Sequence, residues 1–274
     1  MRKILVTTQF TTEDDNALRV AVDLAKNIEA RIYLVNFFKH PISTFSTFGD
    51  VSKINDAEEA VFTVHMVKSN RSKLALLSSH YEQEGVGIYT QIVDDDLVNG
   101  SKQFVLDHEI DILITGENPS VTQDLVNECS CAVLSAPDFV PVENFKNILL
   151  AVDVELNRDR REAIKFVQDL SYYFKSTIHV VHVASPGSGD LVELHKKMNL
   201  FAKKYFFRGY SLNILKSSDE QSALINFGRQ VDAGLYMILK SKTKGIFGFL
   251  SNPLSEEMME EAEVPVMSVN LDNL

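Results

Sequence analysis

The chain has 274 residues, of which 45% are hydrophobic and 24% are charged, and its formal net charge is −11. This composition is typical of a folded globular protein with room for two domains, and it excludes a disordered chain. The negative charge argues against nucleic acid and anionic membranes as partners, because both bind basic surfaces. The sequence shows neither an apolar run long enough to span a bilayer nor a signal peptide, so we expect a cytoplasmic protein.

Short runs rich in Val, Ile and Leu alternate with longer amphipathic segments through the first half of the chain. This alternation is typical of parallel strands joined by crossover helices. Because the runs are apolar on both faces, we expect central strands that helices cover on both sides. The expected strands lie near 2–8, 30–37, 86–93, 110–115 and 131–135, and the expected helices near 12–28, 56–84, 96–108 and 119–129.

An insertion at about 38–55 precedes the long helix and contains Phe38, Phe45 and Phe48 among Ser and Thr residues. Aromatic residues in such a loop favour a segment that folds back over the core or over a neighbouring subunit. A ligand lid is the alternative interpretation.

Acidic residues follow the third expected strand, at Asp94, Asp95 and Asp96. Because the equivalent place in the second half carries Asp219, we expect helix capping at both places. A divalent cation is the alternative for the first cluster, but the sequence offers no fourth ligand nearby.

The two cysteines, Cys129 and Cys131, lie one residue apart near a strand start. Their side chains would then point to opposite faces of the sheet, which disfavours a disulfide between them. We expect two buried thiols.

The segment 136–145 contains Pro137 and Pro141 and is the expected linker, so we divide the chain into domains 1–140 and 141–274. The second domain shows the same alternation. Its expected strands lie near 146–152, 176–183, 210–216, 234–239 and 265–269, and its helices near 157–174, 190–206, 219–230 and 253–262.

The second half repeats the first. The matching segments are 4–9 with 148–153 at the start, 31–36 with 177–182 at the second strand, and 131–135 with 264–268 at the close. A repeat with conserved order predicts two copies of one fold.

These segments resemble the universal stress protein family in tandem form. The resemblance rests on residues 146–153, on the Val-His-Val of 181–183 and on the Glu-Val-Pro-Val-Met-Ser-Val of 263–269, and it covers nearly the whole chain. It implies an α/β fold of two doubly wound domains, each with a five-stranded parallel sheet, of the adenine nucleotide alpha hydrolase-like type. It also implies an internal pseudo-dimer through the last strands 131–135 and 265–269, and it leaves a homodimer open.

One branch of this family binds ATP through an Asp after strand one and a loop of the form Gly-x2-Gly-x9-Gly-Ser/Thr after strand four. In the first half Gln9 stands in place of the Asp, and Gly116 matches the first glycine. Most of the loop is missing, and Glu117 would repel a phosphate. We therefore expect no nucleotide bound in the first half.

In the second half Asp153 matches the Asp of the motif, while other residues fill the glycine positions. A basic loop that contains Lys240, Ser241 and Lys242 remains, and lysines can hold a phosphate by charge. Together with Ser255, these residues form a candidate site for ATP or AMP in the second half only. The alternative is a solvated loop that binds no ligand.

His179 and His182 lie three residues apart on a strand and so point to opposite faces, which disfavours a shared metal ion. His182 matches a common family residue, so we expect it to have a structural role. The sequence contains no catalytic triad order, zinc spacing or P-loop, so we expect no catalytic residue and no bound metal.

The resemblance implies a cytoplasmic universal stress protein that acts in the stress response by binding and assembly, with itself and with an unidentified protein partner, and not by catalysis. The alternative is an adenine-nucleotide sensor with one site in the second half. A slow ATPase is a third interpretation, for which the sequence supplies neither a base nor a metal ligand.

Overall fold

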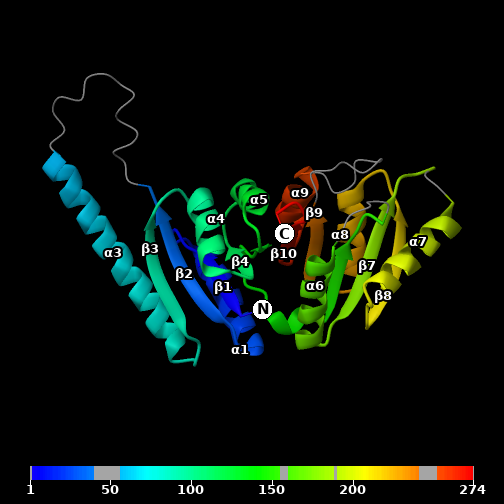
Figure 1. The fold of residues 1–274 in the computed structure, drawn as a ribbon, viewed down its shortest axis with the longest axis horizontal. Coiled ribbons are helices and arrows are strands. Elements are labelled where there is room, and N and C mark those ends of the chain that lie inside the picture. The colour runs from blue at the N-terminus through cyan, green and yellow to red at the C-terminus, as the bar shows by residue number, and fades with distance from the viewer. Residues whose placement is uncertain (1, 40–55, 155–159, 188–189, 241–251, 274) are drawn as a thin grey trace, which may run out of the picture.

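The computed structural model describes residues 2–39, 56–154, 160–187, 190–240 and 252–273, with the backbone alone for 56–62 and 252–255. Nearly all of the insertion at 38–55 lies outside these residues. Figure 1 shows the two halves of the chain side by side, with the strands forming one continuous sheet between layers of helices.

In both halves the described residues alternate between strand and helix, as the sequence predicts. The first half contains β1 Lys3–Thr7, α1 Thr12–Ile28, β2 Arg31–Phe38, α3 Asp56–Glu82, β3 Ile88–Asp94, α4 Leu97–His108, β4 Ile112–Thr115, α5 Pro119–Glu128 and β5 Ala132–Ser135. A short 3₁₀ turn, η1 Val142–Asn144, lies in the linker. The second half contains β6 Asn147–Ala151, α6 Arg161–Phe174, β7 Thr177–Ala184, α7 Leu191–Lys204, β8 Tyr210–Lys216, α8 Glu220–Gln230, β9 Leu235–Lys240, α9 Asn252–Glu261 and β10 Val266–Asn270.

The ten strands form one sheet in the order β3-β2-β1-β4-β5-β10-β9-β6-β7-β8. Within each half every neighbouring pair is parallel, and the order reverses direction between strands one and four of that half. This is the doubly wound arrangement that the sequence predicts, present twice.

The two half-sheets join through one antiparallel pair, in which Val266, Met267 and Ser268 of β10 face Ser135, Leu134 and Val133 of β5. The internal pseudo-dimer through the last strands is therefore confirmed. All six of these residues are buried, so the contact between the halves is part of the hydrophobic core.

Buried apolar side chains form a cluster on each side of the sheet. One cluster contains residues of α1, α6 and α7 together with Val142 and Phe145 of the linker. The other contains residues of α4, α5, α8 and α9. Because the strands between these layers are apolar on both faces, each half has the covered central strands that its sequence predicts.

Aspartates begin several of the helices. Asp96 accepts a hydrogen bond from Asn99 N at 2.9 Å at the start of α4, and Asp219 accepts one from Ser222 N at 3.0 Å at the start of α8. These bonds lower the pKa of both carboxyls. The predicted capping role is confirmed for both residues.

Cys129 and Cys131 are free, buried thiols, as predicted. Among the described residues, no helix combines the length and the apolar character that crossing a bilayer requires.

Candidate functional site

In a doubly wound sheet, ligands bind beyond the carboxyl ends of the strands, where the strand order reverses. In this chain that place lies after β1 and β4 in the first half, and after β6 and β9 in the second. The two places hold different residues.

In the first half, a carboxylate of the chain itself occupies the N-terminus of α1. Asp14 is 2% exposed, and its Oδ2 accepts hydrogen bonds from Gln9 N at 2.7 Å and from Thr11 N at 3.1 Å. Thr11 Oγ1 in turn accepts from Asp14 N at 3.2 Å, which completes a capping box. Two backbone donors that precede α1 are therefore already bonded to a carboxyl group of the chain itself.

Gly116 lies directly after β4 and touches the start of α1. A Cβ atom on Gly116 would lie 2.3 Å from the carbonyl carbon and oxygen of Glu13. The glycine that matches the first glycine of the nucleotide motif thus lets the chain backbone approach the helix closely.

Glu117 follows Gly116 and is half-buried, and burial together with the Asp14 carboxylate raises its pKa. A cavity of about 540 Å³ opens here, and four acidic residues are among those that line it, namely Glu13, Asp14, Glu117 and Glu260. Acidic side chains around a cavity disfavour a phosphate there. The absence of a nucleotide in this half stays a prediction.

In the second half, Asp153 follows β6 and is 5% exposed. Arg160 is also buried, and its Nη2 donates a hydrogen bond to the main-chain oxygen of Asp153 at 2.5 Å. The Arg160 guanidinium lies 5.4 Å from the ring centroid of Phe201, and Arg160 N donates to Tyr205 Oη at 3.2 Å. Burial lowers the pKa of this guanidinium.

Lys240, the last residue of β9, is 1% exposed. Its Nζ donates a hydrogen bond to Oδ1 of Asn127, a residue of α5 in the other half. Because β6 pairs with β9, Asp153 and Lys240 lie at the same edge of the sheet. Ser241 and Lys242 lie outside the described residues, and Ser255 is described by its backbone within α9 only.

His182 and Asn36 occupy equivalent positions on the second strand of each half. Nδ1 of His182 lies 3.2 Å from Val152 O, and Asn36 Nδ2 donates to Thr8 O at 2.7 Å. Since a carbonyl oxygen only accepts, Nδ1 of His182 carries the proton. Both side chains hold the segment after strand one, which supports the structural role predicted for His182.

Two residues of these sites, Asp14 and Arg160, are not among those predicted from the sequence. The spacing of Thr11 and Asp14 is a capping-box pattern that could have revealed Asp14. No local pattern points to Arg160, because its partners are a main-chain oxygen, Phe201 and Tyr205. In the described residues, no group of three or more His, Cys, Asp or Glu side chains could hold a metal ion.

Comparison with known families gives a match to the profile described as "Universal stress protein family" over residues 1–137, half of the chain. The chain belongs to the universal stress protein family. No curated protein matches this universal stress protein in a comparison of the whole chain.

Solved structures with the same fold cover both halves. A universal stress protein from Archaeoglobus fulgidus DSM 4304 has a TM-score of 0.71 at 13% identity and covers 98% of this chain and 96% of its own. A functionally unknown protein from Pseudomonas aeruginosa PAO1 gives 0.63 at 17%, with 100% and 94% covered. The cytoplasmic domain of a prokaryotic cation chloride cotransporter gives 0.57 at 12%, with 98% and 96% covered. At these identities the similarity shows a common tandem fold.

Proposed function

We propose that this universal stress protein acts in the cytoplasm by binding and assembly during the stress response, with 1–140 and 141–274 as its two domains. The observation that carries the proposal is that acidic side chains of the chain itself occupy the place after β1 and β4, where such folds bind ligands. There Asp14 already bonds the backbone N–H groups of Gln9 and Thr11, just before α1, and Glu117 lines the adjoining cavity. What the two halves share is the sheet and the pairing of β5 with β10.

A second candidate function is an adenine-nucleotide sensor with one site in the second half. Its support is that Asp153 and Lys240 follow paired strands at the sheet edge where such folds bind ligands. Ser241, Lys242 and Ser255 would complete the site, with ATP or AMP as the ligand. The hydrogen bond from Lys240 to Asn127 weakens this candidate, because the same ammonium would have to reach a phosphate.

Thermal melting of the whole chain with and without millimolar ATP and Mg²⁺ separates the two functions. A ligand present at 100 times its dissociation constant stabilises the native state by about 2.7 kcal/mol. For a chain of this size that corresponds to a rise in melting temperature of about 5–10 °C.

If the protein acts by binding and assembly without a nucleotide, ATP should not raise its melting temperature. The protein should also release no phosphate from ATP. A rise that Asp153→Ala abolishes and Gln9→Ala leaves intact would establish the sensor instead. Phosphate released in proportion to the enzyme added would show an ATPase and overturn the first proposal.

A further inference from the structure

Helices α1 and α6 present equivalent faces in the two halves. Each ends at a residue in the left-handed conformation, Glu29 with a φ of 54° and Lys175 with a φ of 53°. Counting back from these caps matches four positions on one face of each helix, namely Arg19 with Lys165, Val22 with Gln168, Asp23 with Asp169 and Lys26 with Tyr172. Each helix therefore carries a cation, and a carboxylate four residues later.

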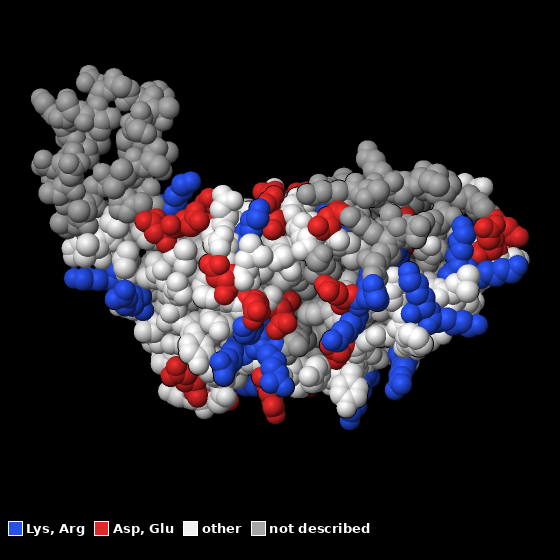
Figure 2. Space-filling model, viewed as in Figure 1, with Lys and Arg blue, Asp and Glu red and all other residues white. Residues whose placement is uncertain are grey.

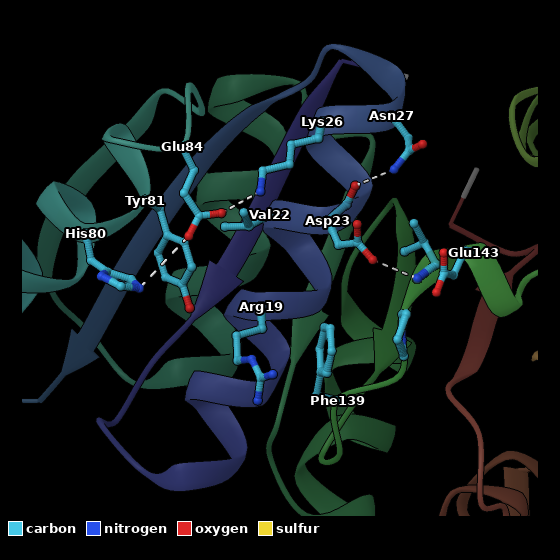
Figure 3. A pocket seen from close by; sticks show the side chains of 12 residues that line it. Arg19, Val22, Asp23, Lys26, Asn27, His80, Tyr81, Glu84, Phe139 and Glu143 are labelled. Atoms are coloured by element: carbon cyan, nitrogen blue, oxygen red, sulfur yellow. Dashed lines mark hydrogen bonds and ion pairs between the residues drawn. The ribbon is translucent and has the colours of Figure 1, made fainter.

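In the first half, the linker binds this face. The guanidinium carbon of Arg19 lies 4.0 Å from the ring centroid of Phe139, and Oδ2 of Asp23 accepts a hydrogen bond from Val142 N at 2.8 Å. Figure 3 shows Arg19 and Phe139 side by side in a groove of about 480 Å³ between α1, the end of α3 and the linker. The cation thus holds an aromatic ring, and the carboxylate holds a main-chain N–H.

In the second half, the equivalent pair lacks these contacts among the described residues. Lys165 is exposed and Asp169 is half-buried. Within the described part of the chain, neither side chain makes a hydrogen bond or ion pair. Tyr172, one turn further along this face, is 82% exposed. The contacts that the linker makes on α1 have no counterpart on α6 among the described residues.

A second exposed aromatic residue lies beside this face. Gln168 of α6 donates hydrogen bonds to the main-chain oxygens of Tyr205 and Phe206, at 2.9 and 3.2 Å. Phe206 is 82% exposed and has a φ of 53°, a conformation that a bulky side chain seldom adopts. Exposed apolar groups that gather in this way mark interaction surfaces.

The neighbouring surface is basic in an otherwise acidic protein. Residues 190–216, which span α7 and β8, contain six Lys or Arg and two Asp or Glu, whereas the whole chain has a net charge of −11. In Figure 2 Lys and Arg side chains gather over α6 to β8, at the lower right of the view. An acidic occupant complements this charge, and the linker itself has Asp138 and Glu143 beside Phe139.

We propose that the α6 face, defined by Lys165, Asp169, Tyr172 and Phe206, binds an acidic, extended segment of a partner protein that carries an aromatic residue. The segment binds as the linker binds α1, with its ring against Lys165 and a main-chain N–H donated to Asp169. This inference rests on the proposed function, since it names the kind of partner that a binding protein would hold.

The test uses the whole chain and a fluorescent peptide with the sequence of residues 136–145, followed by anisotropy. We expect saturable binding that Lys165→Glu weakens about tenfold or more, because it reverses the charge under the ring and opposes an acidic peptide. Asp169→Ala should weaken binding as well, and a peptide with Phe139 replaced by Ala should not bind. The matched control is Lys68→Glu, which makes the same change of charge on the exposed surface of α3 and should leave binding unchanged.

Three results would overturn the proposal. The first is no binding to the native chain. The second is binding that Arg19→Glu abolishes and Lys165→Glu leaves intact, because the peptide would then be exchanging with the linker on α1. The third is a dimer in light scattering that Lys165→Glu dissociates, because a second copy of the chain would then cover the α6 face. A melting shift with ATP would contradict the proposed function and leave the peptide result standing, so the two failures are distinguishable.

Discussion

Leu134 of β5 lies directly opposite Met267 of β10 in the antiparallel pair that joins the two halves of the sheet. Leu134 is 0% exposed and Met267 is 1% exposed, and both belong to the cluster that also contains the linker residues Val142 and Phe145. The contact between the halves therefore has the character of a core, and it should unfold together with the halves.

Met267→Lys should destabilise the whole chain. The substitution places an ammonium group where its neighbours are apolar, and an unpaired buried charge costs about 3–5 kcal/mol. Denaturant unfolding followed by far-UV circular dichroism measures the loss. Leu106→Lys on α4, where the side chain is 54% exposed, is the control and should change stability by less than about 0.5 kcal/mol. Equal midpoints for the two variants would contradict a buried junction.

Gly116→Ala should destabilise the first half. The new Cβ atom would lie 2.3 Å from backbone atoms of Glu13, which cannot move without shifting the start of α1. Overpacking of this kind costs about 1–3 kcal/mol. Gly87→Ala is the matched control, because nothing lies within 4 Å of its Cβ position. A melting temperature equal to that of the control would show that the start of α1 can shift at little cost in free energy.

The order of strands and helices could be predicted from the sequence because each element carries its own pattern. Alternating apolar runs fixed the order, and the aspartates at Asp96 and Asp219 fixed two helix starts. The pairing of the last strands followed from the family resemblance. These features depend on neighbours in the sequence or on the repeat.

Contacts between distant residues could not be predicted in this way. Lys240 was placed in a candidate phosphate loop, and its ammonium bonds Asn127, a residue 113 positions earlier. Arg160 follows a segment outside the described residues. Its burial depends on Phe201 of α7 and on Tyr205, which follows that helix. Nothing in the local sequence distinguishes such residues from solvated loop residues.

Glu117→Gln should stabilise the protein near neutral pH. Burial, and then the Asp14 carboxylate, raise the pKa of Glu117 above its ordinary 4.5. The folded state thus holds this proton more tightly than the unfolded state, and the stability present below pH 4.5 is lost as the pH rises through the raised pKa. Glutamine avoids this loss, so the variant should melt higher than the native chain at about pH 7. Below pH 4.5 the two should melt together.

The control for this prediction is Glu82→Gln, an exposed residue at the end of α3. It makes the same substitution away from the cavity, so an effect that both variants share does not come from the burial of Glu117. If Glu117→Gln raised the melting temperature equally at every pH, the effect would have a cause other than ionisation of Glu117.

Both cysteines should resist thiol reagents in the native state. Burial raises the pKa of Cys129 to about 12 and holds that of Cys131 well above its ordinary value. At about pH 8 roughly one Cys129 thiol in 10⁴ is ionised, and the thiolate is the reactive form. A disulfide reagent should therefore modify both residues only in denaturant. Rapid modification of the native chain, measured by absorbance of the released thiol, would contradict their burial.

Lys240 and Asn127 should be energetically coupled across the two halves. Asn127→Ala leaves the buried Lys240 ammonium without this acceptor, which should cost about 1–3 kcal/mol. In the Lys240→Met background the same substitution should cost less, because no ammonium remains to be satisfied. The difference is the coupling energy of a double-mutant cycle, expected at about 0.5–3 kcal/mol in denaturant unfolding. A coupling of zero would show that this hydrogen bond contributes nothing to the stability of the contact between the halves.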